Sequence, residues 1–258
     1  MKFLEIDKLS VRFGGLLAIE DLSFEVREGE VLSLIGPNGA GKTTAFNAIT
    51  GYLAPSSGEI IFESKKLNGM KPHQVAALGL VRTFQKTSVF AGRSALDNVL
   101  TGLHLRARQT PLAILLGLPY VRREEEDLRV EAGRILQFVN LQNRKGELAS
   151  ALPYGEQRLL EVAIALAARP KLLLLDEPVS GMNPSETAAF MAKLGEIRAL
   201  GITVLLVEHD MKMVMGVSDR VVCLSQGRII ADGTPAEIQV NPEVIKAYLG
   251  ERYKHARR

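Results

Sequence analysis

The chain has 258 residues, of which 47% are apolar and 24% are charged, close to the average for soluble globular domains. This composition argues against intrinsic disorder and low-complexity architectures. Lysine and arginine total 32 and aspartate and glutamate 29, so the formal net charge is +3. That excess is too small over this length to predict nucleic-acid binding.

The sequence gives no sign of export or of membrane insertion. Cys223 is the only cysteine, so it cannot form an internal disulfide, and no oxidising compartment is implied. No uninterrupted apolar stretch reaches about 18 residues, the length that a membrane-spanning helix needs. Residues 1–7 alternate charged and apolar side chains and lack the apolar centre of a signal peptide. We therefore expect a cytoplasmic protein.

The first part of the chain predicts short antiparallel strands. Partly alternating patterns occur at residues 3–7, 10–13, 23–26 and 59–62, and glycine-rich turns join them. We expect these strands to form an antiparallel flank beside the main sheet.

Three short apolar runs predict buried parallel strands, and each ends in polar or glycine residues. They lie at residues 31–35, 172–175 and 203–207. Continuous apolar character suits strands that are buried on both faces, as in a parallel sheet covered by helices. Alternating strands and helices favour an α/β fold, whose ligands sit beyond the carboxyl ends of the strands.

Residues 92–165 predict a mostly helical region. Five apolar residues form a stripe behind the charged stretch 122–127: Leu128, Ala132, Ile135, Leu136 and Val139. A second helical pattern covers residues 159–167, where one face carries Leu160, Ala163, Ile164 and Ala167. Residues 112–120 are the most apolar part, and they suit either a local core or a surface for a partner protein.

One segment between a predicted strand and a predicted helix has the pattern of a phosphate-binding loop, G-x-x-x-x-G-K-[ST]. Its residues are Gly36, Pro37, Asn38, Gly39, Ala40, Gly41, Lys42 and Thr43. The glycines let backbone N–H groups turn inward around phosphate oxygens, and the helix from Thr44 onward points its positive end at the same anion. In this pattern Lys42 reaches the β- and γ-phosphates and the Thr43 hydroxyl ligates Mg²⁺.

Acidic residues and a histidine follow the other two apolar runs. Asp176 ends a buried strand and suits a Mg²⁺ ligand, and Glu177 beside it suits a general base for an attacking water. Taken alone, such a pair is also typical of a turn or a helix cap. His209 closes the third run at the same predicted edge, where it either contacts the γ-phosphate or has a structural role.

Taken in order along the chain, the motifs resemble those of an ATP-binding-cassette (ABC) ATPase. They lie at residues 36–43, 152–157, 176–178, 180–184 and 208–210, so the resemblance covers nearly the whole chain. It implies an α/β fold, a P-loop NTPase ABC-type nucleotide-binding domain with a parallel core sheet, an antiparallel β flank and an inserted helical subdomain. We expect one domain over residues 1–250, with a basic tail at 251–258. The nucleotide-binding core would comprise 1–85 and 166–250, and the helical signature subdomain 86–165.

The resemblance also implies ATP and Mg²⁺ as cofactors and assigns roles to individual residues. Phe13 would stack on adenine, beside the phosphate loop already described, or it is an ordinary strand aromatic. Gln85 would sense the metal and a membrane partner, or it is a solvated loop residue. The metal ligands would be Thr43, Gln85 and Asp176, and the catalytic residues would be Glu177, His209, Gln85 and Lys42.

In ABC ATPases two cassettes sandwich two ATP molecules head to tail, and each signature segment faces the phosphate loop of the other chain. The corresponding ligands here are Tyr154, Gly155 and Glu156. The segment departs from the common Leu-Ser-Gly-Gly-Gln pattern, because Pro153 replaces the capping serine and can donate no hydrogen bond. The contact across the dimer would then depend on the Gly155 N–H, the helix dipole and the Tyr154 hydroxyl. Asn183 also stands where many cassettes carry aspartate.

These departures make the chain similar to the ATPase subunit of branched-chain amino-acid importers. The similarity rests on residues 13–16, 154–158, 181–187 and 247–250. It implies an ATP-hydrolysing subunit that powers uptake of branched-chain amino acids, on the cytoplasmic face of the inner membrane. The implied partners are polytopic membrane permease subunits and a second ABC ATPase subunit, identical or paralogous, and no nucleic acid is expected.

Other functions remain open on the sequence. The chain could serve another importer, for urea or amides, or a lipid exporter. A soluble ABC ATPase associated with nucleic acid or the ribosome would fit a pI near 9.0, but the chain has no second cassette and no sustained heptad run. A binding-only regulator would have no need of a water-positioning carboxylate such as Glu177.

Overall fold

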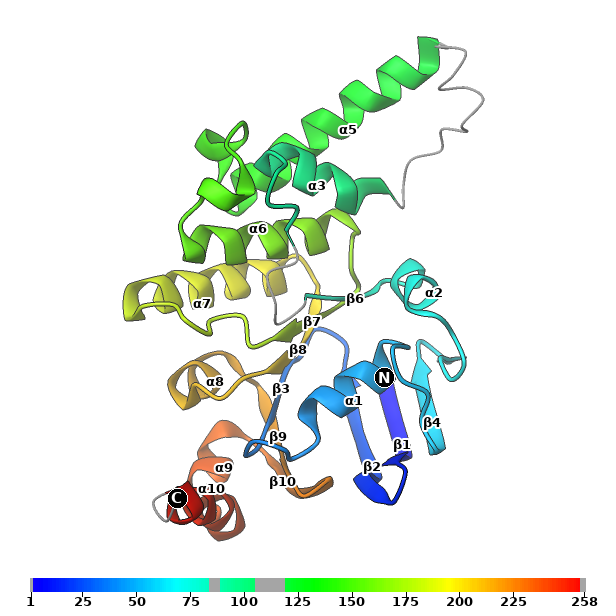
Figure 1. Cartoon of the computed structure of the whole chain (residues 1–258), viewed down its shortest axis with the longest axis vertical. Helices are drawn as coiled ribbons and strands as arrows, with labels where there is room; N and C mark the ends of the chain where they lie inside the picture. The colour runs from blue at the N-terminus through cyan, green and yellow to red at the C-terminus, as the bar shows by residue number, and fades with distance from the viewer. Residues whose placement is uncertain (1, 84–88, 105–118, 256–258) are drawn as a thin grey trace. The chain divides into compact units, whose positions relative to one another are not determined.

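The computed structural model describes residues 2–83, 89–104 and 119–255, with side chains up to residue 249. The chain forms two compact units (Figure 1). The core unit comprises residues 1–82, 171–178 and 191–258, and the helical unit comprises 83–170 and 179–190. Gln85, the tail at 251–258 and most of the apolar stretch 112–120 lie outside what is described, in whole or in their side chains.

A six-stranded sheet with the order β10-β9-β3-β8-β7-β6 organises the core unit. The strands are β3 (Val31–Ile35), β6 (Leu80–Arg82), β7 (Leu172–Asp176), β8 (Thr203–Val207), β9 (Arg220–Ser225) and β10 (Arg228–Gly233). Strands β3, β6, β7, β8 and β9 run parallel to one another. Strand β10, at the edge of this sheet, is antiparallel to its neighbour β9. Every residue of β3, β7 and β8 is buried. The prediction of a parallel sheet from three apolar runs is therefore confirmed.

The N-terminal strands form a second sheet with the order β2-β1-β4-β5. Its strands are β1 (Lys2–Phe13), β2 (Leu16–Arg27), β4 (Ser57–Phe62) and β5 (Lys65–Lys66), all paired antiparallel as predicted. The prediction of two separate strands at 3–7 and 10–13 was wrong, because both belong to β1. The pairing register shifts between Ile6 and Leu9, and Lys8 there has a positive φ of 45°. This bulge interrupts the alternation of apolar and polar residues, so the sequence pattern indicates two strands where the structure has one.

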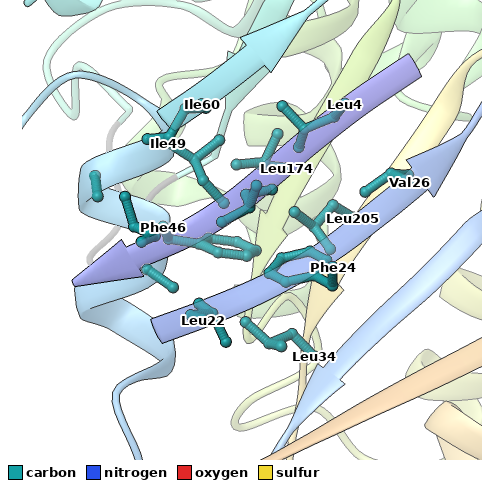
Figure 2. Close-up of a cluster of buried hydrophobic side chains, with 14 of the residues drawn as sticks. Leu4, Leu22, Phe24, Val26, Leu34, Phe46, Ile49, Ile60, Leu174 and Leu205 are labelled. Carbon is teal, nitrogen blue, oxygen red and sulfur yellow. The ribbon is translucent and has the colours of Figure 1, made fainter. Parts of the chain in front are cut away.

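Helix α1 (Lys42–Ile49) follows β3 and packs its buried side chains into the hydrophobic core of this unit (Figures 1 and 2). Phe46 and Ile49 are fully buried, and they join one hydrophobic cluster with Phe24 and Ile60 of the N-terminal sheet and Leu174 of the parallel sheet. Burial of one such side chain contributes about 1.5–3 kcal/mol. The helix that follows the phosphate loop is therefore held by the same core that joins the two sheets.

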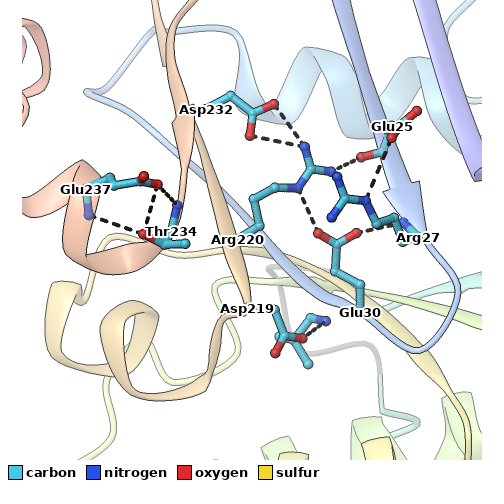
Figure 3. A network of polar contacts seen from close by, with 9 residues as sticks. Glu25, Arg27, Glu30, Asp219, Arg220, Asp232, Thr234 and Glu237 are labelled. Carbon is cyan, nitrogen blue, oxygen red and sulfur yellow. Dashed lines mark hydrogen bonds and ion pairs between the residues drawn. The ribbon is translucent and has the colours of Figure 1, made fainter.

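Arg220 ties the two sheets together near the start of β3 (Figure 3). Its guanidinium forms ion pairs with Glu30 at 2.8 Å and Asp232 at 2.9 Å, and it donates to the Glu25 carbonyl oxygen. Burial lowers the pKa of Arg220, but the hydrogen bond with Glu30 and the two negative charges outweigh it and raise that pKa. On the same strand, burial raises the pKa of the Cys223 thiol to about 11, so the thiol stays protonated at neutral pH.

The helical unit contains α3 (Ala95–Leu103), α5 (Pro119–Phe138) and α6 (Tyr154–Ala167). The predicted stripe is confirmed, because Ala132 and Leu136 of α5 and Val139 directly after it are fully buried in the cluster of this unit. A Cβ atom at Gly102 would lie 2.3 Å from the Ile164 carbonyl oxygen, so the close contact of α3 with α6 requires glycine.

The remaining helices are α2 (Pro72–Ala77), α7 (Pro184–Ala199), α8 (Met211–Val217), α9 (Pro235–Val240) and α10 (Pro242–His255), with short 3₁₀ turns at Gln142–Arg144 and Ala149–Ala151. Over the described parts of the chain, none of the helices combines the length and the apolar character needed to cross a membrane.

Candidate functional site

Glycines shape the loop that connects β3 to α1. Gly36, Gly39 and Gly41 all have positive φ angles, of 146°, 76° and 106°, which other residues rarely adopt. A Cβ atom at Gly36 would lie 2.2 Å from the Leu224 carbonyl oxygen of β9. The first residue of the loop is therefore seated against a neighbouring strand, and no larger residue fits there.

Lys42 places its ammonium group against the loop that precedes it. The Nζ atom donates to the carbonyl oxygens of Gly36 at 2.6 Å and Pro37 at 3.1 Å, and the side chain is buried. Gly41 is the N-cap of α1 and offers no side-chain acceptor to the first N–H groups of the helix. A helix N-terminus of this kind, with a cation beside it, is suited to bind a phosphate anion.

The strand register places the predicted residues along one edge of the sheet. Val207 of β8 pairs with Leu34 of β3 on one side and with Asp176 of β7 on the other. Because the three strands are parallel, the residues that follow them emerge at the same edge: Gly36, Glu177 and Glu208 with His209. Neighbouring strands lie about 5 Å apart, and β8 lies between β3 and β7, so β3 and β7 are separated by about 10 Å.

Glu177 has a strained backbone directly after β7. Its φ of 49° lies in the left-handed region, which costs a residue other than glycine about 1–2 kcal/mol. The Glu177 N–H donates to the Val207 carbonyl oxygen at 2.8 Å, and this bond holds the unusual conformation. Its Oε1 lies 3.9 Å from Nδ1 of His209, whose side chain is 58% exposed. The structure therefore brings the predicted base and the predicted histidine together.

The sequence analysis missed the role of Glu208. This side chain is buried, and its Oε2 atom accepts hydrogen bonds from the backbone N–H groups of His209 at 2.9 Å and Asp210 at 3.1 Å. Asp210 in turn caps α8 by accepting from the Met213 N–H. Glu208 and Asp210 thus fix the backbone that carries His209. The available signal was two acidic residues, Glu208 and Asp210, between a strand and a helix.

Arg82 is a second residue that the sequence analysis missed. Its guanidinium donates to Oδ2 of Asp176 at 2.7 Å and to Oδ1 of Asn47 at 2.7 Å, and it lies over the ring of Phe46. Both members of the Arg82–Asp176 pair are buried. The pair is 94 positions apart in the sequence, and β6 beside β7 brings it together.

The donor set at this edge fits a magnesium ion. Thr43 is an exposed residue, and its hydroxyl and the Asp176 carboxylate are hard oxygen ligands, the kind that Mg²⁺ prefers. Among the described residues, no group of three or more histidine, cysteine, aspartate or glutamate side chains forms a metal cage. Mg²⁺ bound to substrate phosphates commonly uses only one or two protein ligands and keeps several waters.

Phe13 ends β1 with a ring that is 49% exposed, just before the turn at Gly14 and Gly15. An exposed aromatic face at the end of a strand is available to stack on a planar ring. Phe13 lies in the same unit as the phosphate loop. Gln85, predicted to contact the metal and a partner, lies outside the described residues.

In the helical unit, Tyr154, Gly155 and Glu156 begin α6. Pro153 is the N-cap and makes no side-chain cap hydrogen bond, so the first N–H groups of this helix lack the usual hydroxyl partner. The Tyr154 hydroxyl oxygen accepts from Arg158 Nη2 at 2.6 Å, and Arg158 also pairs with Glu161. Burial lowers the pKa of Arg158, but Glu161 and Tyr154 outweigh this effect and raise it.

Asn183 caps the start of α7. Its Oδ1 atom accepts from the N–H groups of Ser185 at 2.9 Å and Glu186 at 3.0 Å. The Glu186 carboxylate accepts from the Asn183 N–H in return. An amide therefore supplies the same cap that aspartate would supply, without the negative charge.

Two family models match this chain. The model described as ABC transporter matches residues 19–180. The model described as branched-chain amino acid ATP-binding cassette transporter matches residues 228–254, which include most of α10.

Curated relatives match the chain over nearly its whole length. The high-affinity branched-chain amino acid transport ATP-binding protein BraF of Pseudomonas aeruginosa is 45% identical over 96% of this chain and 98% of its own. The corresponding protein LivG of Escherichia coli is 42% identical with the same coverage.

Solved structures of ATP-binding cassettes share the fold. A nucleotide-free cassette from an ABC transporter has a TM-score of 0.85 and 31% identity, and the match covers 96% of this chain and 99% of that one. The ADP conformation of an ABC transporter cassette also has a TM-score of 0.85, with 32% identity over 97% of this chain and 99% of that one.

We predict that loss of the Arg82 guanidinium destabilises the core unit. Arg82→Ala leaves the buried Asp176 without its ion-pair partner, and removal of one member of a buried pair costs about 3–5 kcal/mol. Urea unfolding measures the change in free energy. Lys66→Ala, which breaks the exposed ion pair with Glu59, is the control and should cost less than about 1 kcal/mol. Equal effects of the two variants would contradict the assignment.

Proposed function

The chain belongs to the ABC transporter family, and on that premise we propose that it is the ATP-hydrolysing subunit of an importer for branched-chain amino acids. The family membership supports ATP binding and hydrolysis. One observation carries the choice of solute: relatives named for branched-chain amino acid transport are 42–45% identical over 96% of the chain. The match of the C-terminal segment 228–254 supports the same choice.

We assign ATP to the core unit, and in this proposal the helical region 86–165 is the signature subdomain. The N–H groups of residues 39–43 and the start of α1 receive the phosphates. Lys42 would exchange its carbonyl partners for phosphate oxygens, because an ionised acceptor makes the stronger hydrogen bond. Phe13 would stack on adenine with its exposed ring.

Thr43 and Asp176 are the residues that would hold Mg²⁺. When bound, the ion neutralises charge on the phosphate oxygens as the bond to the γ-phosphate breaks. Asp176 ends β7, and it is buried and paired with Arg82, so its carboxylate is held in one orientation. Gln85 is proposed as a further contact of the metal.

Glu177 is the proposed general base. Its carboxylate would accept a proton from the attacking water as the water oxygen bonds to the γ-phosphorus and ADP leaves. The strained backbone of Glu177 and the adjacent His209 restrict where the carboxylate points. His209 would donate to the γ-phosphate, and Glu208 positions it by holding its backbone N–H.

A second cassette, identical or paralogous, would complete each ATP site. We propose that Tyr154, Gly155 and Glu156 of one chain face the phosphate loop of the other. The N-terminus of α6 supports this proposal, because its N-cap Pro153 makes no side-chain cap hydrogen bond and its positive end favours an anion. Its Tyr154 hydroxyl accepts from Arg158, so its own proton remains suited to donation toward a phosphate.

Permease subunits in the inner membrane are the proposed partners, and the chain would lie peripherally on the cytoplasmic face. The segment around Phe90 is a candidate docking surface, because the Phe90 ring is 57% exposed. Buried Asn98 holds this segment in place, accepting from the Phe90 N–H at 2.7 Å and donating to the Phe90 carbonyl oxygen at 3.1 Å. An apolar ring on a fixed backbone is suited to insert into a partner.

We expect Glu177→Gln to abolish turnover and to retain ATP binding. The amide keeps the shape of the side chain but cannot accept the proton of the water, and loss of a positioned base lowers the rate about 10²- to 10⁴-fold. Phosphate release and calorimetric titration with ATP measure the two properties. Glu126→Gln on the exposed face of α5 is the matched control and should be fully active. Normal hydrolysis by Glu177→Gln would remove this residue from its role.

The docking proposal is tested by Phe90→Asp. A carboxylate at this position should prevent insertion into an apolar pocket, so co-purification with the permease subunits should fall at least tenfold. ATP binding by the purified chain should be unchanged, which shows that the variant folds. Phe90→Leu keeps an apolar side chain and serves as the control. Unchanged assembly and transport in the aspartate variant would rule out Phe90 as a docking residue.

The solute assignment is tested by uptake in the organism that encodes the chain. Deletion of the gene should slow uptake of radiolabelled leucine and leave urea uptake unchanged. A plasmid copy of the natural sequence should restore leucine uptake, and a Glu177→Gln copy should not. A deletion that slows urea uptake and spares leucine would replace the proposed solute class with amides.

A further inference from the structure

The last helix of the chain contacts the first residue of the phosphate loop. Tyr248 lies on α10, 212 positions from Gly36, and its hydroxyl oxygen accepts a hydrogen bond from the Gly36 N–H at 3.0 Å. Gly36 is the first residue after β3, and the bond therefore satisfies a backbone donor at the point where the strand becomes the loop.

Gly36 is contacted by residues of three elements, β9, α1 and α10. A Cβ atom there would lie 2.2 Å from the Leu224 carbonyl oxygen, so β9 blocks movement in that direction. The Gly36 carbonyl oxygen accepts from Lys42 Nζ at 2.6 Å. One residue therefore connects the Tyr248 hydroxyl on one side to the ammonium group of Lys42 on the other.

The ring of Tyr248 is fixed in turn by apolar packing. It lies against a buried cluster whose members are Ile35, Val214, Val221, Cys223, Ile238 and Val244. Ile35 belongs to β3 and directly precedes Gly36, so the cluster against which Tyr248 packs includes the neighbour of the residue that it bonds. A phenol ring held in this way presents its oxygen with little loss of side-chain entropy when the bond forms.

We propose that Tyr248 is a positioning residue for the nucleotide site, which holds Gly36 and through it the loop and Lys42 in the geometry that receives the triphosphate. Tyr248 acts through Gly36 and does not touch the substrate. The inference rests on the assignment of residues 36–43 as the ATP site, and it gives α10 a part in nucleotide binding.

Tyr248→Phe tests the proposal with the ring retained. Loss of one neutral hydrogen bond corresponds to a change of about 2- to 10-fold in an equilibrium constant. We expect the Kd for ATP, measured by calorimetry on the full chain, to rise by that factor, and kcat at saturating ATP to change less than twofold. Tyr120→Phe removes a hydroxyl from an exposed ring of α5 and should leave the Kd unchanged.

A structural role alone would give a different result. If the hydroxyl only stabilises the fold, Tyr248→Phe lowers the thermal unfolding midpoint of the nucleotide-free chain and leaves the Kd for ATP as it was. That outcome overturns the proposal. Failure of hydrolysis in the natural chain, with the Kd still responding to Tyr248→Phe, would count against the proposed function and not against this inference.

The coupling between α10 and ATP binding can also be measured on the natural chain, because such a coupling acts equally in both directions. If α10 favours the binding geometry of the loop, ATP must favour the docked state of α10 by the same coupling free energy. Hydrogen exchange of backbone amides in residues 242–249 should therefore slow when the natural chain is saturated with ATP. Exchange that is identical with and without ATP would contradict the coupling, whether or not Tyr248→Phe folds.

Discussion

The seating of Lys42 against its own loop is the interaction on which the rest of the site depends. A buried ammonium group is costly unless hydrogen-bond acceptors surround it, and the Gly36 and Pro37 carbonyl oxygens supply them. Only glycine at position 36 allows this approach, because Leu224 of β9 leaves no room for a Cβ atom. Neutral dipoles satisfy the cation less well than an anion does, so the loop favours phosphate oxygens when they arrive.

The parallel sheet places the proposed catalytic residues at the same edge as this loop. Val207 pairs with Leu34 and with Asp176, so a single register brings the carboxylates that follow β7 and β8 to the same side as the loop. The carboxylates then have different tasks because their surroundings differ. Asp176 is buried against Arg82, Glu208 is buried on backbone N–H groups, and Glu177 lies beside the exposed His209.

Local patterns predicted most of this arrangement, and long-range contacts account for what they missed. Apolar runs identified β3, β7 and β8, and spacing identified the loop, because both signals lie within a few neighbouring residues. The Arg82–Asp176 and Tyr248–Gly36 contacts join residues 94 and 212 positions apart, which no short window contains. The bulge near Lys8 divided β1 in the prediction because it interrupts the alternation that marks a strand.

Asn183 and Pro153, which depart from the common cassette pattern, preserve local structure while they change the local charge and the available hydrogen-bond donors. Asn183 caps α7 through the two N–H bonds that an aspartate would accept, so the neutral amide costs no helix cap. Pro153 offers no side-chain bond to α6, but it still accepts from the Gln157 N–H through its carbonyl oxygen. Both departures from the common pattern therefore leave their helices intact. We expect their effect at the groups that the N-termini of α6 and α7 contact. For α6 that is the proposed phosphate site of a second cassette, where Pro153 supplies none of the hydrogen bonds that a serine hydroxyl would donate.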